Sequence, residues 1–362
     1  MVSPKTIEQW RQAPRLNTFA CFFNNTATGI AGAPGLMKPS PDKGLLQYDI
    51  DSLVFWDSHR QLWGHFDSHY FASIPFRVEE ECRLGSAILA YALEAWARTR
   101  RGATVYTLGA GEGTFARTLA KLGDGRLNTL CCSPTAGNRE SFYANRGSSN
   151  AHFYYGPFFD LTEESYWSNV DLHPFRDGFD VLLEDTTFQM YGADRDNQLA
   201  FVVPRIRENG LFIQIQKLSH SKREEYDRRE RQKDEEFKSR FFTRTQIASK
   251  KSEILKTMSN YEVGLEETIA ALRQNFRFSV VTWNSGNFYT IVSSNSERSL
   301  KDFVNGMIRP AIPAEFSYEQ LPFTLLNNAE TGPNIDWSWR PARSVGEEIA
   351  EGPVSSQRFQ SR

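Results

Sequence analysis

The chain has 362 residues, of which 40% are hydrophobic and 24% are charged, and its formal net charge is -2. This composition is ordinary for folded globular protein and argues against a chain that is mainly disordered. The small net charge argues against binding to nucleic acid or acidic membranes through the charge of the whole chain, so that a partner must be recognised locally.

The cysteines and the first residues of the chain indicate the cellular compartment in which the protein is expected. The first residues, MVSPKTIEQWRQ, are polar and unlike a signal peptide, and no apolar run approaches the roughly 20 residues of a membrane span. No cysteine pair has C-x-x-C spacing, so neither a disulfide framework nor a zinc site is indicated. We therefore expect reduced thiols and a soluble, cytoplasmic protein without a membrane partner. The four cysteines are Cys21, Cys82, Cys131 and Cys132.

Residues 1–76 are rich in glycine, proline, asparagine and aromatic side chains. This composition predicts an irregular N-terminal extension or lid. Within it, His65, Asp67 and His69 would lie on one face if the segment GHFDSH were a strand, as a metal site requires. Because two histidines in an irregular aromatic segment more often only form hydrogen bonds, we predict no metal.

A helix is predicted over residues 78–102, and a strand, a tight turn and a helix are predicted over residues 104–122. The turn contains Gly109, Gly111 and Gly113. Alternate glycines leave room for a ligand beside the free N–H groups of the helix, or they allow the helix to pack closely on the strand. Dinucleotide sites favour G-x-G-x-x-G and an acid at the end of the second strand. This chain has G-x-G-x-G and no such acid, which argues against a hydride-transfer cofactor.

Strands and helices alternate along the next part of the chain. The final two strands are joined by NSGN and form a predicted hairpin, so that an antiparallel edge follows a parallel sheet. The patterns predict strands at 126–135, 150–159, 179–188, 210–218, 277–283 and 287–294, and helices at 136–145, 194–209 and 264–276.

Three further segments lie outside this alternation. Residues 219–260 form a charge-dense insertion that is predicted to be helical, with more basic than acidic side chains. Residues 297–328 are predicted to be a C-terminal extension, and residues 329–362 a disordered tail.

The segment VYTLGAGEGTFARTLA resembles the first motif of class I S-adenosylmethionine-dependent methyltransferases. The segments FDVLLEDTTF and IRENGLFIQIQKL and the closing hairpin are similar to later segments of that family, in the expected order, over about residues 83–294. The resemblance implies an α/β fold with a Rossmann-like, mostly parallel seven-stranded sheet, an antiparallel terminal hairpin and helices on both faces, over residues 77–296. It also implies a transferase that uses S-adenosyl-L-methionine.

The same resemblance implies which residues hold the cofactor. The family usually has one acid at the position of Thr107 and another at the end of the second strand, where this chain has Cys132 and Ser133. A charge-assisted hydrogen bond is stronger than a neutral one, so Glu112 or a group from the N-terminal extension is expected to substitute. The implied cofactor residues are Thr107, Gly109, Ala110, Gly111, Glu112 and Gly113 near the methionine part, Cys132 and Ser133 near the ribose, Gly156, Pro157 and Phe158 near the adenine, and Asp185.

Catalytic groups are expected at the tip of the fourth strand, where Glu184 and Asp185 stand. Methyl transfer needs a positioned acceptor and, for oxygen, removal of a proton. The alternative is that one of the two acids only caps the following loop. FtsJ-like ribose 2′-O-methyltransferases place an Asp after the fourth strand and a Lys on the fifth, and Asp185 and Lys217 correspond to these. The other two positions of that tetrad hold Arg83 and Asn287.

Three hypotheses follow for the function of the protein. The first is methylation of a small-molecule or peptide-like acceptor in an aromatic pocket formed by FDSHYFASIPF, HFYYGPFFDL and TTFQMYG. The second is modification of RNA, with the basic insertion and its aromatic side chains binding the strand. The third is a non-catalytic partner subunit. Because bases and acids interleave along the insertion, we expect it to cover a small-molecule site or to form a homodimer contact.

Overall fold

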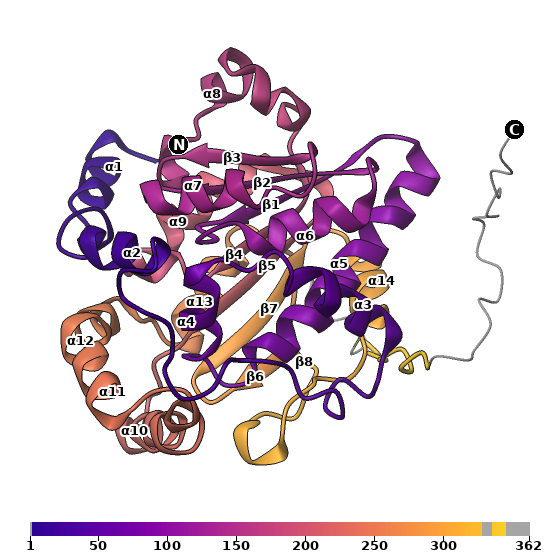
Figure 1. Ribbon diagram of the computed structural model, residues 1–362. Helices are drawn as coiled ribbons and strands as arrows, with labels where there is room; N and C mark the ends of the chain where they lie inside the picture. Colours follow the sequence, from indigo (N-terminus) through magenta and orange to yellow (C-terminus); the bar gives the residue numbers. More distant parts are fainter. Residues whose placement is uncertain (1, 328–334, 345–362) are drawn as a thin grey trace, which may run out of the picture.

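Residues 2–327 and 335–344 are described by the computed structural model. They form one central sheet with strand order β3-β2-β1-β4-β5-β7-β6-β8 (Figure 1). The strands are β1 Ala103–Leu108, β2 Leu127–Ser133, β3 Ala151–Tyr155, β4 Phe179–Asp185, β5 Ile206–Lys217, β6 Phe278–Ser285, β7 Phe288–Ser294 and β8 Phe323–Leu326.

Strands β1 to β5 are parallel, while β7 is antiparallel to both β5 and β6. The predicted α/β fold, with a mostly parallel sheet and a reversed terminal hairpin, is therefore confirmed. The predicted number of seven strands is wrong, because β8 pairs antiparallel with β6 and adds an eighth. That strand lies in the predicted C-terminal extension. It is too short for its apolar pattern to predict a strand from the sequence.

Two hydrophobic clusters occupy the two faces of the sheet. Helices α3, α5, α6 and α14 pack on one face, and α8, α9 and α13 pack on the other. The sheet is thus covered on both sides, as a parallel sheet requires. The helices are α1 Pro4–Arg11, α2 Ala20–Ala27, α3 Ile50–His59, α4 His65–Phe71, α5 Arg77–Thr99, α6 Thr114–Gly123, α7 Ala136–Ala144, α8 Glu163–Ser168, α9 Arg195–Val202, α10 Arg223–Gln232, α11 Arg244–Lys250, α12 Lys256–Met258, α13 Leu265–Arg273 and α14 Glu297–Asn305.

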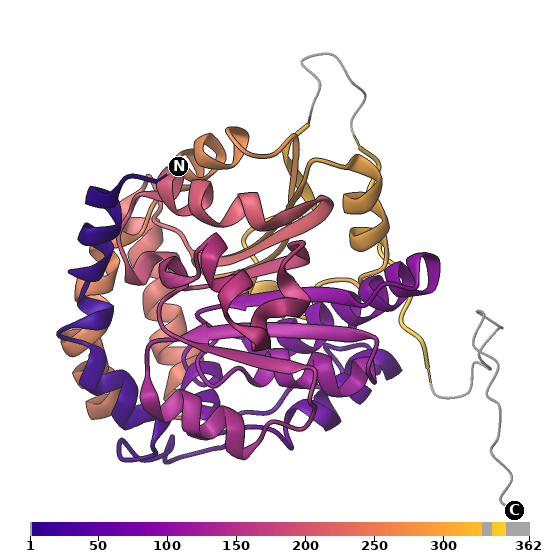
Figure 2. The same ribbon diagram turned by 90° about the horizontal axis from the view of Figure 1, so that it is seen from above.

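The N-terminal segment contains four short helices, α1 to α4, joined by irregular stretches. Figures 1 and 2 show α1 and α2 (indigo) beside the helices of the 219–260 insertion (orange) at one side of the molecule. Phe19 and Phe23 of the N-terminal segment share a hydrophobic cluster with Ile254 of the insertion. The expectation of an irregular extension missed these helices, because each spans at most ten residues and its aromatic side chains are buried by other segments. The insertion is helical, as expected.

The described stretch 335–344 is held against the N-terminal segment. Arg340 donates from Nη1 and Nη2 to the buried carboxylate of Asp49, at 2.7 and 2.9 Å. Burial disfavours the charged form of Asp49, but its hydrogen bonds with Arg340, Arg343 and Ser52 outweigh that effect and lower its pKa. This stretch departs from the predicted disordered tail, whose remaining residues lie outside the described ranges.

We expect the substitution Arg340→Ala to lower the free energy of unfolding by about 3 kcal/mol, because it leaves a buried carboxylate without its charged partner. Chemical denaturation monitored by circular dichroism measures this loss. Arg98→Ala is the matched control, since the Arg98–Glu94 pair is exposed and should change stability by less than about 0.5 kcal/mol. Equal effects of the two substitutions would contradict the importance of this contact.

Candidate functional site

The glycine turn joins β1 to α6 at the carboxyl edge of the sheet. Gly109 and Gly111 have φ values of 64° and 54°, in the left-handed region that favours glycine. A Cβ atom at Gly109 would lie 2.0 Å from Oγ1 of Thr187, and one at Gly111 would lie 2.7 Å from the Phe66 ring. The turn is therefore covered closely by protein, and both explanations of its glycines, close packing and ligand binding, stay open.

A small cavity of about 60 Å³ lies directly above this turn, and we call it the turn cavity. Its walls come from the turn, α4, α5, the first residues of α6, and the tip of β4 with the segment that follows it. The side chains that line it include Phe66, Asp67, Tyr70, Glu81, Asp185 and Met190.

Asp185 and Glu184 point to opposite faces of β4, because successive side chains of a strand alternate. Asp185 lines the turn cavity, where its carboxylate accepts hydrogen bonds from Tyr70 Oη and from Arg77 Nη2, the latter at 2.8 Å. Glu184 is fully buried on the other face and accepts from the backbone N–H groups of Thr187 and Phe188, at 2.6 and 2.9 Å. Glu184 thus caps the loop after β4, as the alternative prediction had it, and Asp185 alone faces the turn.

Arg77 is fully buried and bridges two carboxylates below the turn cavity. Its Nη1 atom lies 2.6 Å from Glu81, and its Nη2 atom lies 2.8 Å from Asp185. Burial lowers the pKa of Arg77, but the two carboxylates outweigh it and raise that pKa well above its usual range. Burial raises the pKa of Glu81 to about 8, although Arg77 opposes this shift.

Sequence analysis missed this ion-pair group. The acids at the start of the predicted helix over residues 78–102 suited the helix dipole, which is a solvent-exposed role. In the structure Glu79, Glu80 and Glu81 are all buried. The available signal was a run of three acids that follows an arginine and a long aromatic segment. The spacing of charged residues along a helix, however, does not show whether those residues are buried.

Asp67 belongs to a second polar group at the turn. It accepts hydrogen bonds from Thr114 Oγ1 and from the N–H of Gly64, both at 2.8 Å. Its segment is a helix, α4, and not the strand that the metal alternative assumed. No cluster of three or more metal-ligating side chains is found within the described ranges.

The predicted acid substitute, Glu112, is fully buried beside the turn. Its Oε1 atom accepts from the N–H of Phe66 at 3.0 Å. Burial raises the pKa of Glu112 to about 8, with nearby Asp67 adding to the shift. Its role as a cofactor ligand stays a prediction.

The predicted ribose and adenine positions are covered by the N-terminal segment. Arg15 is buried there; its Nη2 atom donates to Thr135 Oγ1 at 2.7 Å, and its guanidinium lies 4.1 Å from the centre of the Phe23 ring. Trp10 packs on Phe158, with ring centres 5.4 Å apart. Sequence analysis did not single out Arg15 or Trp10, since neither belongs to a motif.

The residues predicted at the ends of β1 and β2 make internal contacts. Thr107 is buried and its hydroxyl donates to the carbonyl oxygen of Leu130. Cys132 accepts from Tyr106 Oη at 3.1 Å, and burial raises its pKa to about 11. Ser133 Oγ accepts from Asn138 Nδ2 at 2.8 Å. Gly156 and Pro157 follow β3 directly and lead into Phe158.

Lys217 lies at the end of β5 within a separate group of charges. Its ammonium donates to Tyr226 Oη, Glu230 and Glu262 at 2.7 to 3.0 Å. Burial opposes its charge, but the two glutamates raise the pKa of Lys217, so it is a poor base. Within the described ranges no hydrogen bond or ion pair joins any two of Asp185, Lys217, Arg83 and Asn287. The FtsJ-like tetrad is therefore not assembled.

The insertion does not present its aromatic side chains for stacking on bases. Tyr226, Phe237, Phe241 and Phe242 are all buried. Phe237 and Phe241 pack against Phe76 in one cluster. The alternative in which these rings stack on RNA bases is not supported, because the insertion uses the rings to attach itself to the rest of the molecule.

A second cavity of about 120 Å³ lies between the N-terminal helices and the insertion, and we call it the lysine cavity. It shares Phe66, Tyr70, Thr186 and Met190 with the turn cavity. Of the three aromatic segments predicted to form a pocket, FDSHYFASIPF and TTFQMYG line it, whereas the rings of HFYYGPFFDL do not. Its walls include the apolar side chains Phe22, Phe23, Ile74, Ile254, Leu255, Met258 and Phe288 and the lysines Lys217, Lys233, Lys238 and Lys250.

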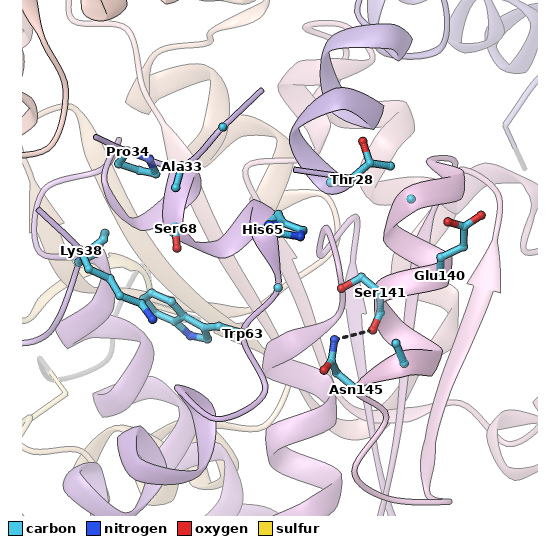
Figure 3. Close-up of a pocket in the computed structure, with 16 residues that line it drawn as sticks. Thr28, Ala33, Pro34, Lys38, Trp63, His65, Ser68, Glu140, Ser141 and Asn145 are labelled. Atoms are coloured by element: carbon cyan, nitrogen blue, oxygen red, sulfur yellow. Dashed lines mark hydrogen bonds between the residues drawn. The ribbon is translucent and has the colours of Figure 1, made fainter. Parts of the chain in front are cut away.

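A larger hollow of about 720 Å³ lies outside this region, between α4, α7 and the loop after α2. Figure 3 shows His65, Trp63 and Glu140 around it, with Lys38 beside Trp63. None of the predicted site residues lines it. Volume alone thus does not identify the functional site.

Comparisons with known proteins give only distant matches. No family model matches the chain, and no curated protein matches it. Among solved structures it is similar to an O-methyltransferase family protein from Burkholderia thailandensis, with 12% identity, a TM-score of 0.36, and coverage of 59% of this chain and 58% of that one. It is also similar to the mitomycin 7-O-methyltransferase MmcR, with 16% identity, a TM-score of 0.36, and coverage of 68% and 67%.

A third similar structure is the plantazolicin methyltransferase BpumL in complex with SAH, with 8% identity, a TM-score of 0.41, and coverage of 70% of this chain and 98% of that one. The chain thus spans little more than half of the Burkholderia protein and nearly all of BpumL. At these identities and TM-scores the likeness carries no argument about function. In the described ranges, no helix has the length and apolar character needed to cross a bilayer.

Glu184 gives a pH-dependent prediction. Burial raises its pKa to about 7, above the value of about 4.3 in an unfolded chain, so the folded state binds the proton more tightly. Stability should therefore fall as pH rises from about 4.5 to 7. Glu184→Gln keeps an oxygen acceptor for the two N–H groups but cannot ionise, and should remove a pH-dependent loss on the order of 3 kcal/mol.

The measurement is the free energy of unfolding of both proteins at pH 4.5, 6 and 7.5. Glu94→Gln serves as the control, because Glu94 is exposed. The same pH dependence in wild type and Glu184→Gln would show that Glu184 does not hold its proton in the fold.

Proposed function

We propose that the chain is an enzyme that transfers a methyl group from S-adenosylmethionine to a small-molecule or peptide-like acceptor. The observation that carries this proposal is the arrangement at the carboxyl edge of the sheet. There the glycine turn after β1 and Asp185 after β4 line one cavity, which shares a wall with a second. Two adjacent cavities at this edge suit a reaction in which cofactor and acceptor must meet.

The strand order supports the same proposal. The resemblance of the glycine motif implies a mostly parallel sheet with a reversed terminal hairpin, and the parallel strands β3-β2-β1-β4-β5 followed by the reversed β7 have this form. The motif also occupies its implied place, between the first strand and the following helix.

The polar groups around the turn cavity fit the amino-acid end of S-adenosylmethionine. Asp185 lines the cavity, and a carboxylate at this place suits an ammonium group. Arg77 is not among the side chains that line the cavity, and it holds Asp185 in place from behind through the ion pair at 2.8 Å. When bound, the cofactor supplies an electrophilic methyl group, and these residues would orient its amino-acid end so that the methyl group faces the lysine cavity.

The turn cavity is too small for the cofactor unless part of the protein moves. At about 60 Å³ it is much smaller than the roughly 300–1,000 Å³ of ordinary ligand pockets. Phe66 covers the turn, and Arg15 covers the positions expected for ribose and adenine. Both belong to the N-terminal segment. We infer that the parts of this segment around Arg15 and Phe66 move aside to admit the cofactor, while α3 stays packed in the core.

The acceptor fits the lysine cavity best, with the insertion as its cover. No specific observation favours RNA, whose binding surface would need exposed rings and unpaired cations. A cytoplasmic location and a homodimer stay predictions, since nothing in the described ranges tests them.

Titration calorimetry with S-adenosylmethionine and S-adenosylhomocysteine tests the cofactor. We expect both to bind the wild-type chain, and Gly111→Ala to weaken that binding at least tenfold, because its Cβ atom enters the turn cavity. Gly125→Ala is the matched control: Gly125 also has a positive φ, of 76°, but a Cβ atom there meets nothing within 4 Å.

Circular dichroism confirms that each variant is folded. Equal binding by both variants would place the cofactor elsewhere. No binding by the wild-type chain would overturn the proposed activity and favour a non-catalytic subunit.

A further inference from the structure

The lysine cavity combines apolar walls with an unusual concentration of enclosed ammonium groups. Four lysines line it, and Lys217, Lys233 and Lys238 are at most 8% exposed. Lysines are rarely buried without a charged partner. The partners of each lysine therefore decide whether the cavity has a free positive charge.

Three of the four lysines have carboxylate partners. Lys217 is paired with Glu230 and Glu262. Lys233 lies 2.5 Å from Glu230, and Lys238 lies 3.1 Å from Asp234. Four lysines thus share three carboxylates, of which Asp234 also lies 3.8 Å from the exposed Lys251, and one of the four lysines has no carboxylate partner. The three carboxylates are Glu230, Asp234 and Glu262.

Lys250 is the lysine without a carboxylate partner. Its Nζ atom donates to the hydroxyl of Ser73 at 2.8 Å and lies 5.3 Å from the centre of the Phe242 ring. Within the described ranges it forms no ion pair with a carboxylate. Burial and the nearby charge of Lys233 lower its pKa to about 8, so at neutral pH it remains mostly protonated and has a place for one anion.

The apolar walls restrict what that anion can be attached to. Rings and aliphatic side chains from the N-terminal segment, the loop after β4, β7 and the insertion surround the space. A cavity of about 150 Å³ holds a benzene molecule in an engineered protein core, and the lysine cavity measures about 120 Å³, so a ring with a carboxylate enters only when the N-terminal helices that line it move aside. The space suits one charged group and one small apolar body, and it is too small for a nucleotide.

We propose that the lysine cavity binds a small aromatic carboxylic acid, with its carboxylate on Lys250 and its ring against the apolar walls. This inference rests on the proposed function, because it identifies that acid, with a hydroxyl group on the far side of its ring, as the methyl acceptor. The hydroxyl oxygen would form the new bond to the methyl carbon and lose its proton to Asp185, while the bond from that carbon to sulfur breaks and S-adenosylhomocysteine leaves. The wall shared with the turn cavity, formed by Phe66, Tyr70, Thr186 and Met190, would place the far side of the ring toward the cofactor. A single lysine without a carboxylate partner favours a monoanion.

The test compares acids with their neutral amides. Binding of benzoate and phenylacetate, and of benzamide and phenylacetamide, is measured at pH 7 by ligand-observed NMR on the full chain without cofactor. We expect each acid to bind wild type at least tenfold more tightly than its amide. Lys250→Gln should abolish this preference and Lys250→Arg should retain it.

Lys256→Gln is the matched control, because Lys256 is an exposed lysine of the same insertion and forms no ion pair with a carboxylate within the described ranges; it should retain the preference. The inference is overturned if neither acid is preferred to its amide, or if Lys250→Gln keeps the preference. These measurements contain no cofactor and are therefore independent of cofactor binding. If the wild-type chain fails to bind the cofactor in calorimetry but still prefers the acids, only the proposed methyl transfer is overturned. Loss of the acid preference alone would overturn only the acceptor class.

Discussion

The buried guanidinium of Arg77 connects the elements that meet at the candidate site. From the first turn of α5 it reaches Glu81 on its own helix and Asp185 at the tip of β4, and Asp185 also accepts from Tyr70 of α4. Removing one partner of such a buried pair is costly, because the other charge stays uncompensated. This group therefore links α4 to β4 beside the glycine turn and keeps the carboxyl group of Asp185 at the turn cavity.

Much of the fold could be predicted from the sequence, because the sheet depends on strong local patterns. The apolar runs of β1, β4, β5 and the terminal hairpin correspond to buried strands with parallel or reversed pairing as expected. The N-terminal helices were missed because they depend on contacts between distant segments and not on local patterns. Their aromatic side chains, such as Trp10 and Phe66, are ordered by contacts with residues more than a hundred positions away or with the glycine turn, and no periodicity reports such contacts.

The candidate site was predictable only in part. The glycine turn and Asp185 follow from motif and strand position, since the carboxyl ends of parallel strands meet at one edge. Whether Glu184 or Asp185 faces that edge depends on strand register, which a one-residue shift would invert. The charge around Lys250 depends on which acidic side chains of the insertion point into the cavity. Basic and acidic residues alternate along these helices, so the sequence does not show which face is buried by tertiary packing.

A crystal structure of the chain grown with S-adenosylhomocysteine tests the central claim most directly, namely that the cofactor binds over the glycine turn beneath a movable N-terminal segment. The account predicts ligand density between the turn and Asp185, with Phe66 and Arg15 displaced from their present positions. Ligand density at another place, or density over the turn with the N-terminal helices in their present arrangement, would contradict it.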